Sequence, residues 1–164
     1  MNTFEFTIVA CGLDPQADDF EDRFFEAGCD DATIAFARGA ILLQFARQAG
    51  TLEEAIDSAI NNVKAAGAIV DRVEPDYLVS LSEIAERAQL TRQAISNYAR
   101  GKRGTDFPHP IARVTTESPL WAWPEVAAWL EDHGKVEHIV VEHAYLIRGF
   151  NESLEDRHER RKDV

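Results

Sequence analysis

The chain has 164 residues, of which 45% are hydrophobic and 28% charged, and its formal net charge at pH 7 is −12. This hydrophobic content is enough for packed cores and argues against a chain that is disordered throughout, while the length suits one ordinary domain or two small ones. No apolar run reaches the roughly 18 residues that a membrane-spanning helix needs, so the sequence predicts no membrane span.

The N-terminus, MNTFEFTIVA, lacks the basic start and the small-residue cleavage site of a secretory signal peptide. We therefore expect a cytoplasmic protein. Cys11 and Cys29 are too few and too far apart in the sequence for a disulfide framework, so both are expected to be reduced thiols.

The negative charge is unevenly distributed along the chain. Residues 1–76 carry five Lys/Arg and fifteen Asp/Glu, a charge of −10, and residues 117–164 carry six and eleven, a charge of −5. Residues 77–116 carry six Lys/Arg and three Asp/Glu, a charge of +3. A basic segment in an acidic chain indicates local contact with phosphates, because affinity for nucleic acid depends on the charges at the contact.

Residues 1–76 show strand and helix patterns in the order β-α-β-β-α-β. TFEFTIVA alternates as a half-buried strand, and Asp14-Pro15 suits the start of a helix that stops at Gly28. DATIAF and AILLQFAR form a strand pair around Arg38-Gly39. TLEEAIDSAINNVKAAG begins with a capping-box pattern and has one apolar side, and AIVDRVEPD supplies the last strand.

This order predicts an α+β protein whose first domain, residues 1–76, is ferredoxin-like, with two helices covering one face of a four-stranded sheet. The ferredoxin-like fold carries many unrelated functions, so it does not define one here. Its open sheet face and acidic first helix can bind a small ligand, pair with another subunit or dock a protein. For the acidic run ADDFEDRFFE, a solvated helix face is the preferred interpretation.

Residues 77–134 begin with two short helices joined by a tight turn. Ser80 and Glu83 form a capping-box pattern, Gln89-Leu90 makes the turn, and Thr91 is a good N-cap for the second helix. The small Ala85 suits the crossing point of two close helices. The buried sides are predicted to contain Leu81, Ile84, Ala85, Ala88, Ala94, Ile95 and Tyr98.

The outward side of the second helix carries the residue types that read DNA. Arg pairs bidentately with guanine, and Gln or Asn with adenine, when they project from a helix into the major groove. Lys102 and Arg103, past the helix end, suit phosphates. The alternative is a small helical domain whose polar face contacts protein or solvent. The candidate DNA-contacting residues of this helix and of the segment just past it are Thr91, Arg92, Gln93, Ser96, Asn97, Arg100, Lys102 and Arg103.

The segments SLSEIAERAQLTRQAISNY, FPHPIARV and PEVAAWL, with Trp121 between the last two, resemble the MerR-like winged helix-turn-helix proteins, particularly the short AlpA/excisionase-type regulators. The resemblance covers about residues 78–131. It implies that the second helix faces the major groove and that Arg113 and nearby wing residues reach phosphates or the minor groove. Two departures stand out: Gln89 occupies a turn position that is usually Gly, and Glu117 lies in a wing tip that is usually basic.

The C-terminal segment, residues 135–164, is predicted to form one long helix with a coiled-coil seam. In MerR-like proteins such a helix joins two subunits, so that two reading heads span a palindromic site. The alternative is that the helix packs on its own N-terminal domain. The predicted seam, with spacings of four and three residues, consists of Val136, Val140, His143, Ile147, Phe150 and Leu154.

The sequence gives no pattern for catalysis, a metal or another cofactor. It has no phosphate-cradling glycine loop and no nucleophile elbow. None of the five histidines lies in a His-Glu-x-x-His or Cys-x-x-Cys context, and His138 with Glu142 fits a surface hydrogen bond between successive helical turns. We therefore expect a protein that is not an enzyme.

Two hypotheses of different classes remain. The first is a dimeric, sequence-specific regulator of transcription that binds double-stranded, palindromic DNA, with the acidic N-terminal domain sensing a ligand or docking a protein. The second is an antitoxin- or immunity-type protein that neutralises a partner through residues 1–76 and regulates its own synthesis through the helix-turn-helix. The acidic surroundings suit the first hypothesis, because they suppress non-specific DNA binding.

Overall fold

The structure, a computed structural model, describes residues 1–101 and 106–163. In the described residues it is an α+β protein with 45% helix and 24% strand. It divides into two compact units, residues 1–75 with 149–164, and residues 76–148. The sequence-based division treated residues 135–164 as one separate segment, whereas here the long C-terminal helix contributes residues to both units.

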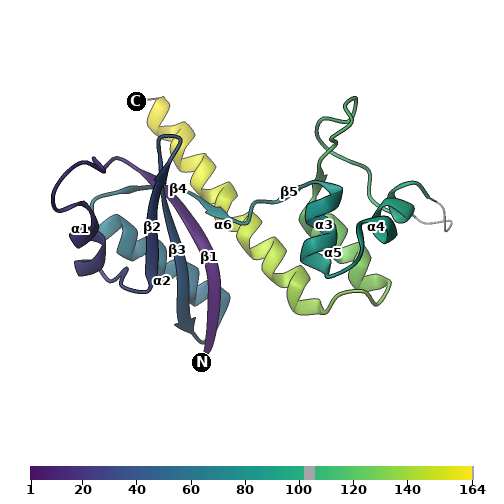
Figure 1. The fold of residues 1–164 in the computed structure, drawn as a ribbon, viewed down its shortest axis with the longest axis horizontal. Coiled ribbons are helices and arrows are strands. Elements are labelled where there is room, and N and C mark those ends of the chain that lie inside the picture. The colour runs from purple at the N-terminus through teal and green to yellow at the C-terminus, as the bar shows by residue number, and fades with distance from the viewer. Residues whose placement is uncertain (102–105, 164) are drawn as a thin grey trace. The chain divides into compact units, whose positions relative to one another are not determined.

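The first unit is built on one four-stranded antiparallel sheet with the strand order β2-β3-β1-β4 (Figure 1). The two-residue connection between β2 and β3 has Arg38 at φ 52° and Gly39 at φ 81°, the left-handed geometry that tight hairpins require. The elements of this unit are β1 (Asn2–Cys11), α1 (Phe20–Glu26), β2 (Ala32–Ala37), β3 (Ala40–Ala49), α2 (Leu52–Ala65) and β4 (Ile69–Glu74), with the second half of α6.

The helix α1 starts later than the sequence predicted. The side chain of Asp14 accepts a hydrogen bond of 2.9 Å from the backbone N–H of Gln16, and the carbonyl of Asp14 accepts one of 3.1 Å from Ala17. These bonds form a turn that competes with the first helical turn, a known tendency of Asp side chains. The helix therefore begins at Phe20, where Phe20 and Phe24 are buried.

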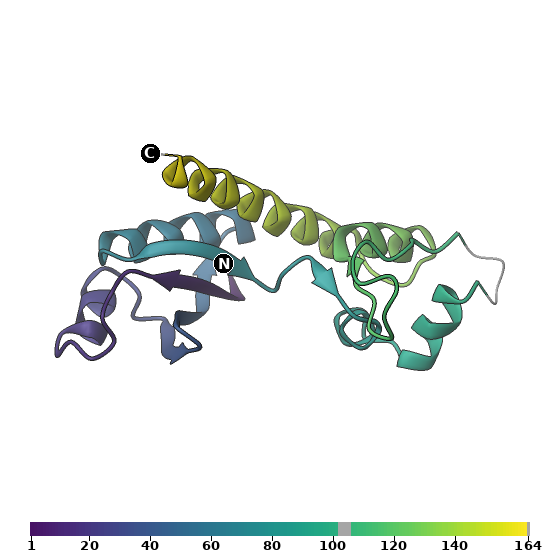
Figure 2. The same ribbon diagram turned by 90° about the horizontal axis from the view of Figure 1, so that it is seen from above.

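One face of the sheet forms the core of the first unit. Phe6 lies opposite Phe45 and Ile8 opposite Leu43 across β1 and β3, and all four side chains are buried. Helix α2 packs on β1, β3 and β4 with an apolar side (Figure 2). Each fully buried side chain of this size contributes about 1.5–3 kcal/mol, so this face stabilises the unit. The buried residues of α2 are Leu52, Ala55, Ile56, Ala59, Ile60 and Val63.

The second unit is held together by aromatic side chains from separate segments. Trp129 lies 5.0 Å from both Tyr98 and Phe107 between ring centroids, and Phe107 lies 6.5 Å from Trp121. The connection before β6 contains one bridge, between Ala112 and Leu120. The elements are β5 (Leu78–Val79), α3 (Leu81–Ala88), α4 (Arg92–Ala99), β6 (Trp121–Ala122), α5 (Trp123–Asp132) and the first half of α6 (His138–Lys162).

The buried side of α6 is rotated by one residue from the predicted seam. Val141 and Ala144 are buried in the second unit, and Asn151 is buried in the first. These positions follow Val140, His143 and Phe150 of the predicted seam by one residue, which is about 100° around a helix. His143, Ile147 and Phe150 are consequently half-exposed, whereas Leu154 is buried, with 4% of its surface exposed. Val136 lies before the helix begins.

The second half of α6 closes one edge of the sheet. β4 is an edge strand, and Val73, which pairs with Ile8 on one side, is hydrogen-bonded to Asn151 on the other. The Asn151 Oδ1 atom accepts a 2.7 Å bond from the N–H of Val73, and Nδ2 donates a 2.9 Å bond to its carbonyl. A covered edge cannot pair with another strand, which is one way proteins avoid aggregation.

A candidate nucleic-acid interface

The helices α3 and α4 are set by two side-chain caps and one left-handed residue. Ser80 Oγ accepts a 3.3 Å bond from the N–H of Glu83, whose carboxylate accepts a 3.2 Å bond from the N–H of Ser80. Gln89 ends α3 at φ 55° and ψ 40°, so this non-glycine residue adopts the conformation for which Gly is usually selected. Thr91 Oγ1 then accepts a 3.1 Å bond from the N–H of Ala94 and starts α4.

The side of α4 opposite its exposed face is fixed in the core of the unit. Ile95 and Tyr98 are buried, and Ala85 of α3 is buried among the same side chains. A small residue at this position lets the two helices approach closely. Because the start and the inner side of α4 are held, its outer side chains project from a fixed element, which is what base readout requires.

The outer face of α4 carries most of the predicted DNA-contacting residues. Thr91, Arg92, Gln93 and Arg100 are exposed, and Ser96 and Asn97 are half-buried. The side-chain nitrogen of Gln93 donates a 3.0 Å hydrogen bond to Asn97 Oδ1, so these two side chains orient each other. Lys102 and Arg103 lie outside the described residues.

Arg113 lies on a different segment, in the connection between α4 and β6. It is exposed and has φ 54°, and its carbonyl accepts bonds of 3.0 Å from the N–H and 2.8 Å from the hydroxyl of Thr116. These bonds close a tight turn at the position where the predicted wing has its tip. Glu117 is also exposed in this turn, so the tip carries one cation and one anion.

Two tryptophans anchor the chain that follows α4, a role that the sequence interpretation did not assign. Trp121 Nε1 donates a 2.9 Å bond to the carbonyl of Pro108, and Trp129 Nε1 donates a 2.9 Å bond to Asp106 Oδ1. The indole donor holds the pKa of the Asp106 carboxyl below its usual value. The aromatic residues flanked by Pro were the available signal, but their polar partners cannot be identified from spacing.

One arginine of the basic segment is used within the fold. Arg87 Nη1 donates a 2.9 Å bond to the carbonyl of Asp76, and its guanidinium lies 5.6 Å from the centre of the Trp123 ring. Such a contact adds a cation–π attraction to the hydrogen bond. Part of the +3 charge of residues 77–116 is therefore committed to structure.

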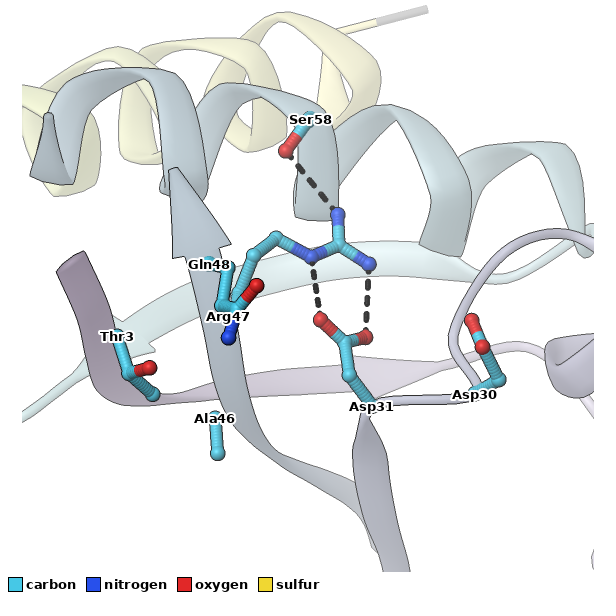
Figure 3. A pocket seen from close by; sticks show the side chains of 7 residues that line it. All are labelled: Thr3, Asp30, Asp31, Ala46, Arg47, Gln48 and Ser58. Carbon is cyan, nitrogen blue, oxygen red and sulfur yellow. Dashed lines mark hydrogen bonds and ion pairs between the residues drawn. The ribbon is translucent and has the colours of Figure 1, made fainter. Parts of the chain in front are cut away.

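A second candidate site, in the first unit, is a cavity of about 480 Å³ beside Arg47 (Figure 3). Arg47 Nε and Nη2 donate bonds of 2.8 and 2.9 Å to the two oxygens of Asp31, and Nη2 also donates 2.8 Å to the Gly28 carbonyl. Its Nη1 atom donates to Ser58 and Asn62 at 3.1 and 2.8 Å. The five N–H groups of an arginine are thus all used.

Arg47 therefore ties three segments of the first unit together instead of presenting a charge to a ligand. Its exposed fraction is 8%, and the hydrogen bonds to Asp31 raise its pKa further, so the guanidinium is a permanent buried cation. Removing one partner of such a pair leaves an uncompensated charge, which typically costs 3–5 kcal/mol. Arg47 continues the alternation of buried positions in β3, a place that the sequence interpretation did not assign to it.

The histidines and cysteines form no metal site in the described part of the chain, where no group of three or more His, Cys, Asp or Glu side chains converges. His138 lies 2.7 Å from Glu131 and 3.3 Å from Glu142, and the bond to Glu131 raises its pKa. Partial burial lowers the pKa of His143. Burial also raises the pKa of Cys29 to about 11, so this thiol stays protonated at neutral pH.

Comparison with known protein families, with curated proteins and with solved structures gives no match to this chain. No helix within the described residues is long and apolar enough to cross a membrane.

Proposed function

We propose that the protein is a regulator of transcription that binds double-stranded DNA sequence-specifically as a homodimer, without catalytic activity. The observation that carries this proposal is the exposed face of α4, where Arg92 and Gln93 stand in the first turn of a helix fixed by α3. In helix-turn-helix proteins, residues of this turn reach base edges in the major groove. The MerR-like resemblance of residues 78–131 supports the same assignment.

In the proposed complex the residues of α4 divide into two groups. Arg92 would pair with guanine, and the amides of Gln93 and Asn97, which already orient each other, would pair with adenine. Arg100, at the end of α4, would bind a phosphate and set the register without reading sequence. Arg113 would contact the backbone from the wing, where the neighbouring Glu117 weakens its attraction to phosphate.

The first unit is proposed to be ferredoxin-like and to act as the sensing or docking module. Its strand order, β2-β3-β1-β4, combined with the β-α-β-β-α-β element order, supports this fold. Two such chains would place two copies of α4 on the half-sites of a palindrome. His143, Ile147 and Phe150, which are half-exposed on α6, would form part of the subunit contact.

The test is selection of bound duplexes from a random DNA pool by the full chain. We expect enrichment of a palindromic sequence whose half-sites lie about one helical turn, 34–36 Å, apart. A consensus with one half-site would contradict the dimeric arrangement. The absence of any enriched sequence would contradict the proposal as a whole.

A second function, capture of a basic protein partner in the manner of an antitoxin, is favoured by the surface around α1. Phe25 is 65% exposed beside the acidic Glu21 and Asp22, and Phe36 of β2 is 50% exposed. Aromatic side chains surrounded by charge are typical of protein interfaces. A Phe25→Ser variant that keeps DNA selectivity but no longer captures the partner protein would favour this function over ligand sensing.

A further inference from the structure

A small cavity of about 180 Å³ lies in the first unit, where the end of α2, the start of β4 and the last turns of α6 meet. Lys64, Arg157, His158 and Arg161 line it, over apolar atoms of residues such as Ala68 and Leu154. Arg157 and Arg161 are four residues apart and therefore share one side of α6. No acidic residue lines this cavity, whereas aspartates line the cavity beside Arg47 and the one beside Phe25.

The gathering of cations is unusual for this part of the chain. Residues 1–75 and 149–164 together contain nine Lys/Arg and nineteen Asp/Glu, a charge of −10, yet three of the nine cations line one cavity. Within the described residues, none of the three makes an ion pair with a carboxylate. Burial lowers the pKa of Lys64, and the charges of Arg157 and Arg161 lower it further. Lys64, Arg157 and Arg161 are solvent-exposed around the cavity, and a bound anion would offset the repulsion between them.

The side chains match a phosphate group in chemistry and the cavity matches it in size. Two guanidinium groups bind phosphate oxygens through planar forks, and an ammonium adds a compact charge. His158 is held in the wall of the cavity, with Nε2 3.2 Å from the carbonyl of Val70 and 3.4 Å from Asp71 Oδ1. The volume is below the roughly 300–1,000 Å³ of pockets that hold drug-sized ligands. A phosphate group with a small organic part would fit, and the apolar floor would contact that part.

We infer that this cavity binds a small phosphorylated molecule through its phosphate group, which gives the first unit a ligand of defined chemistry. A DNA backbone is a poorer occupant, because it is bound by extended rows of cations and not by three around a recess. The inference does not rest on DNA binding by α4, because all the residues that line the cavity belong to the first unit.

The experiment titrates the isotopically labelled full chain with inorganic phosphate and with pyrophosphate, at constant ionic strength adjusted with chloride. We expect saturable amide shifts at Ala68–Val70 and at residues 157–161, in the millimolar range or tighter. Arg161→Gln and Lys64→Gln should each weaken binding at least about tenfold, which corresponds to about 1.4 kcal/mol. Because these residues lie on different helices, a local change in α6 cannot account for both losses.

The matched control is Arg160→Gln, which removes the same charge from an exposed neighbour that does not line the cavity. It should leave phosphate binding within about twofold of wild type, since screening weakens the influence of charges outside the cavity. Equal losses in Arg160→Gln and Arg161→Gln, or no saturable shift with either anion, would overturn the inference. Saturation by a DNA duplex without saturation by the free anions would also overturn it and would assign the cluster to DNA backbone contact.

Discussion

At the scale of single residues, the exposed face of α4 presents one side chain that can contact a base by itself and two side chains that are hydrogen-bonded to each other. Arg92 is exposed with its guanidinium available for bidentate pairing, whereas Gln93 and Asn97 are joined by a 3.0 Å hydrogen bond. Substitution of Asn97 would therefore also release Gln93. Losses from substitutions at these two positions are not expected to add, because residues in one hydrogen-bond network couple.

We predict that Arg92→Ala and Asn97→Ala weaken binding to the selected duplex by about 1–3 kcal/mol and to random duplexes much less. The reason is that pairing with base edges depends on sequence. Lys102→Ala, at a predicted phosphate contact, should weaken binding to both duplexes alike. Fluorescence titration of each variant with both duplexes measures these affinities. If all three variants lost equal affinity for the selected and the random duplex, α4 would not be the element that contacts bases.

Residue patterns in the sequence predicted much of this local structure, and the reasons are physical. The caps at Ser80 and Thr91 and the hairpin at Arg38-Gly39 depend on bonds between residues close in sequence, so spacing reveals them. The hydrogen-bond partners of Arg47 lie between 11 and 19 positions away from it in the sequence. No local sequence pattern identifies these partners. The predicted start of α1 was wrong because Asp14 forms a turn of its own.

At the scale of elements, α6 shows why a helical pattern can leave its orientation open. Its sequence contains apolar residues in two adjacent phases, represented by Val140 and Val141, so periodicity alone favours neither phase. In the structure the phase containing Val141, Ala144 and Asn151 is buried within the chain. Asn151 contributes to this orientation because its amide binds both backbone groups of Val73, a long-range match that sequence analysis missed.

We predict that Asn151→Leu destabilises the first unit by about 2–4 kcal/mol, because the buried N–H and carbonyl of Val73 would lose their partner. The free energy of unfolding from urea denaturation measures the change. Ser153→Ala, at an exposed position two residues away on α6, should stay within about 0.5 kcal/mol of wild type. A similarly small effect of Asn151→Leu would mean that water replaces the amide.

We also predict that Ile147→Asp and Phe150→Asp convert the proposed dimer to a monomer without unfolding the chain. Both side chains are half-exposed in the single chain, and a charge buried in an apolar subunit contact costs several kcal/mol. Sedimentation velocity measures the state of association. Leu154→Asp is the contrasting variant, since Leu154 is buried in its own chain and this change should lower stability instead. Unchanged dimers of both variants would place the subunit contact elsewhere.

At the scale of the whole molecule, the charge is divided between the units. The first unit carries −10 of the total charge of −12, although Lys64, Arg157 and Arg161 make one of its cavities basic. The second unit contains the candidate DNA interface. Deleting residues 1–76 would be a poor test of the role of the acidic charge. That deletion would remove β4 and leave the buried Asn151 without the backbone groups of Val73 that it binds.

We instead predict that neutralising α1 with Glu21→Gln, Asp22→Asn and Glu26→Gln raises affinity for random DNA by up to about tenfold at low salt, because repulsion of the phosphates decreases. Affinity for the selected site should rise less, so the specificity ratio falls. The difference should vanish near 1 M salt, where the Debye length is about 3 Å. The charge-preserving changes Glu21→Asp, Asp22→Glu and Glu26→Asp are the control. An unchanged ratio at low salt would limit the acidic surface to partner binding or solubility.

The bond between Asn151 and Val73 also has a consequence for synthesis on the ribosome. The two residues are 78 positions apart, so β4 leaves the ribosome long before the helix that covers it. At about 5–20 residues per second, the outer edge of β4 stays open for roughly 4–16 seconds in each nascent chain. During that interval the N-terminal sheet offers an unpaired strand edge to neighbouring nascent chains. We therefore expect the β4 edge to be most open to pairing with other chains before α6 has been synthesised.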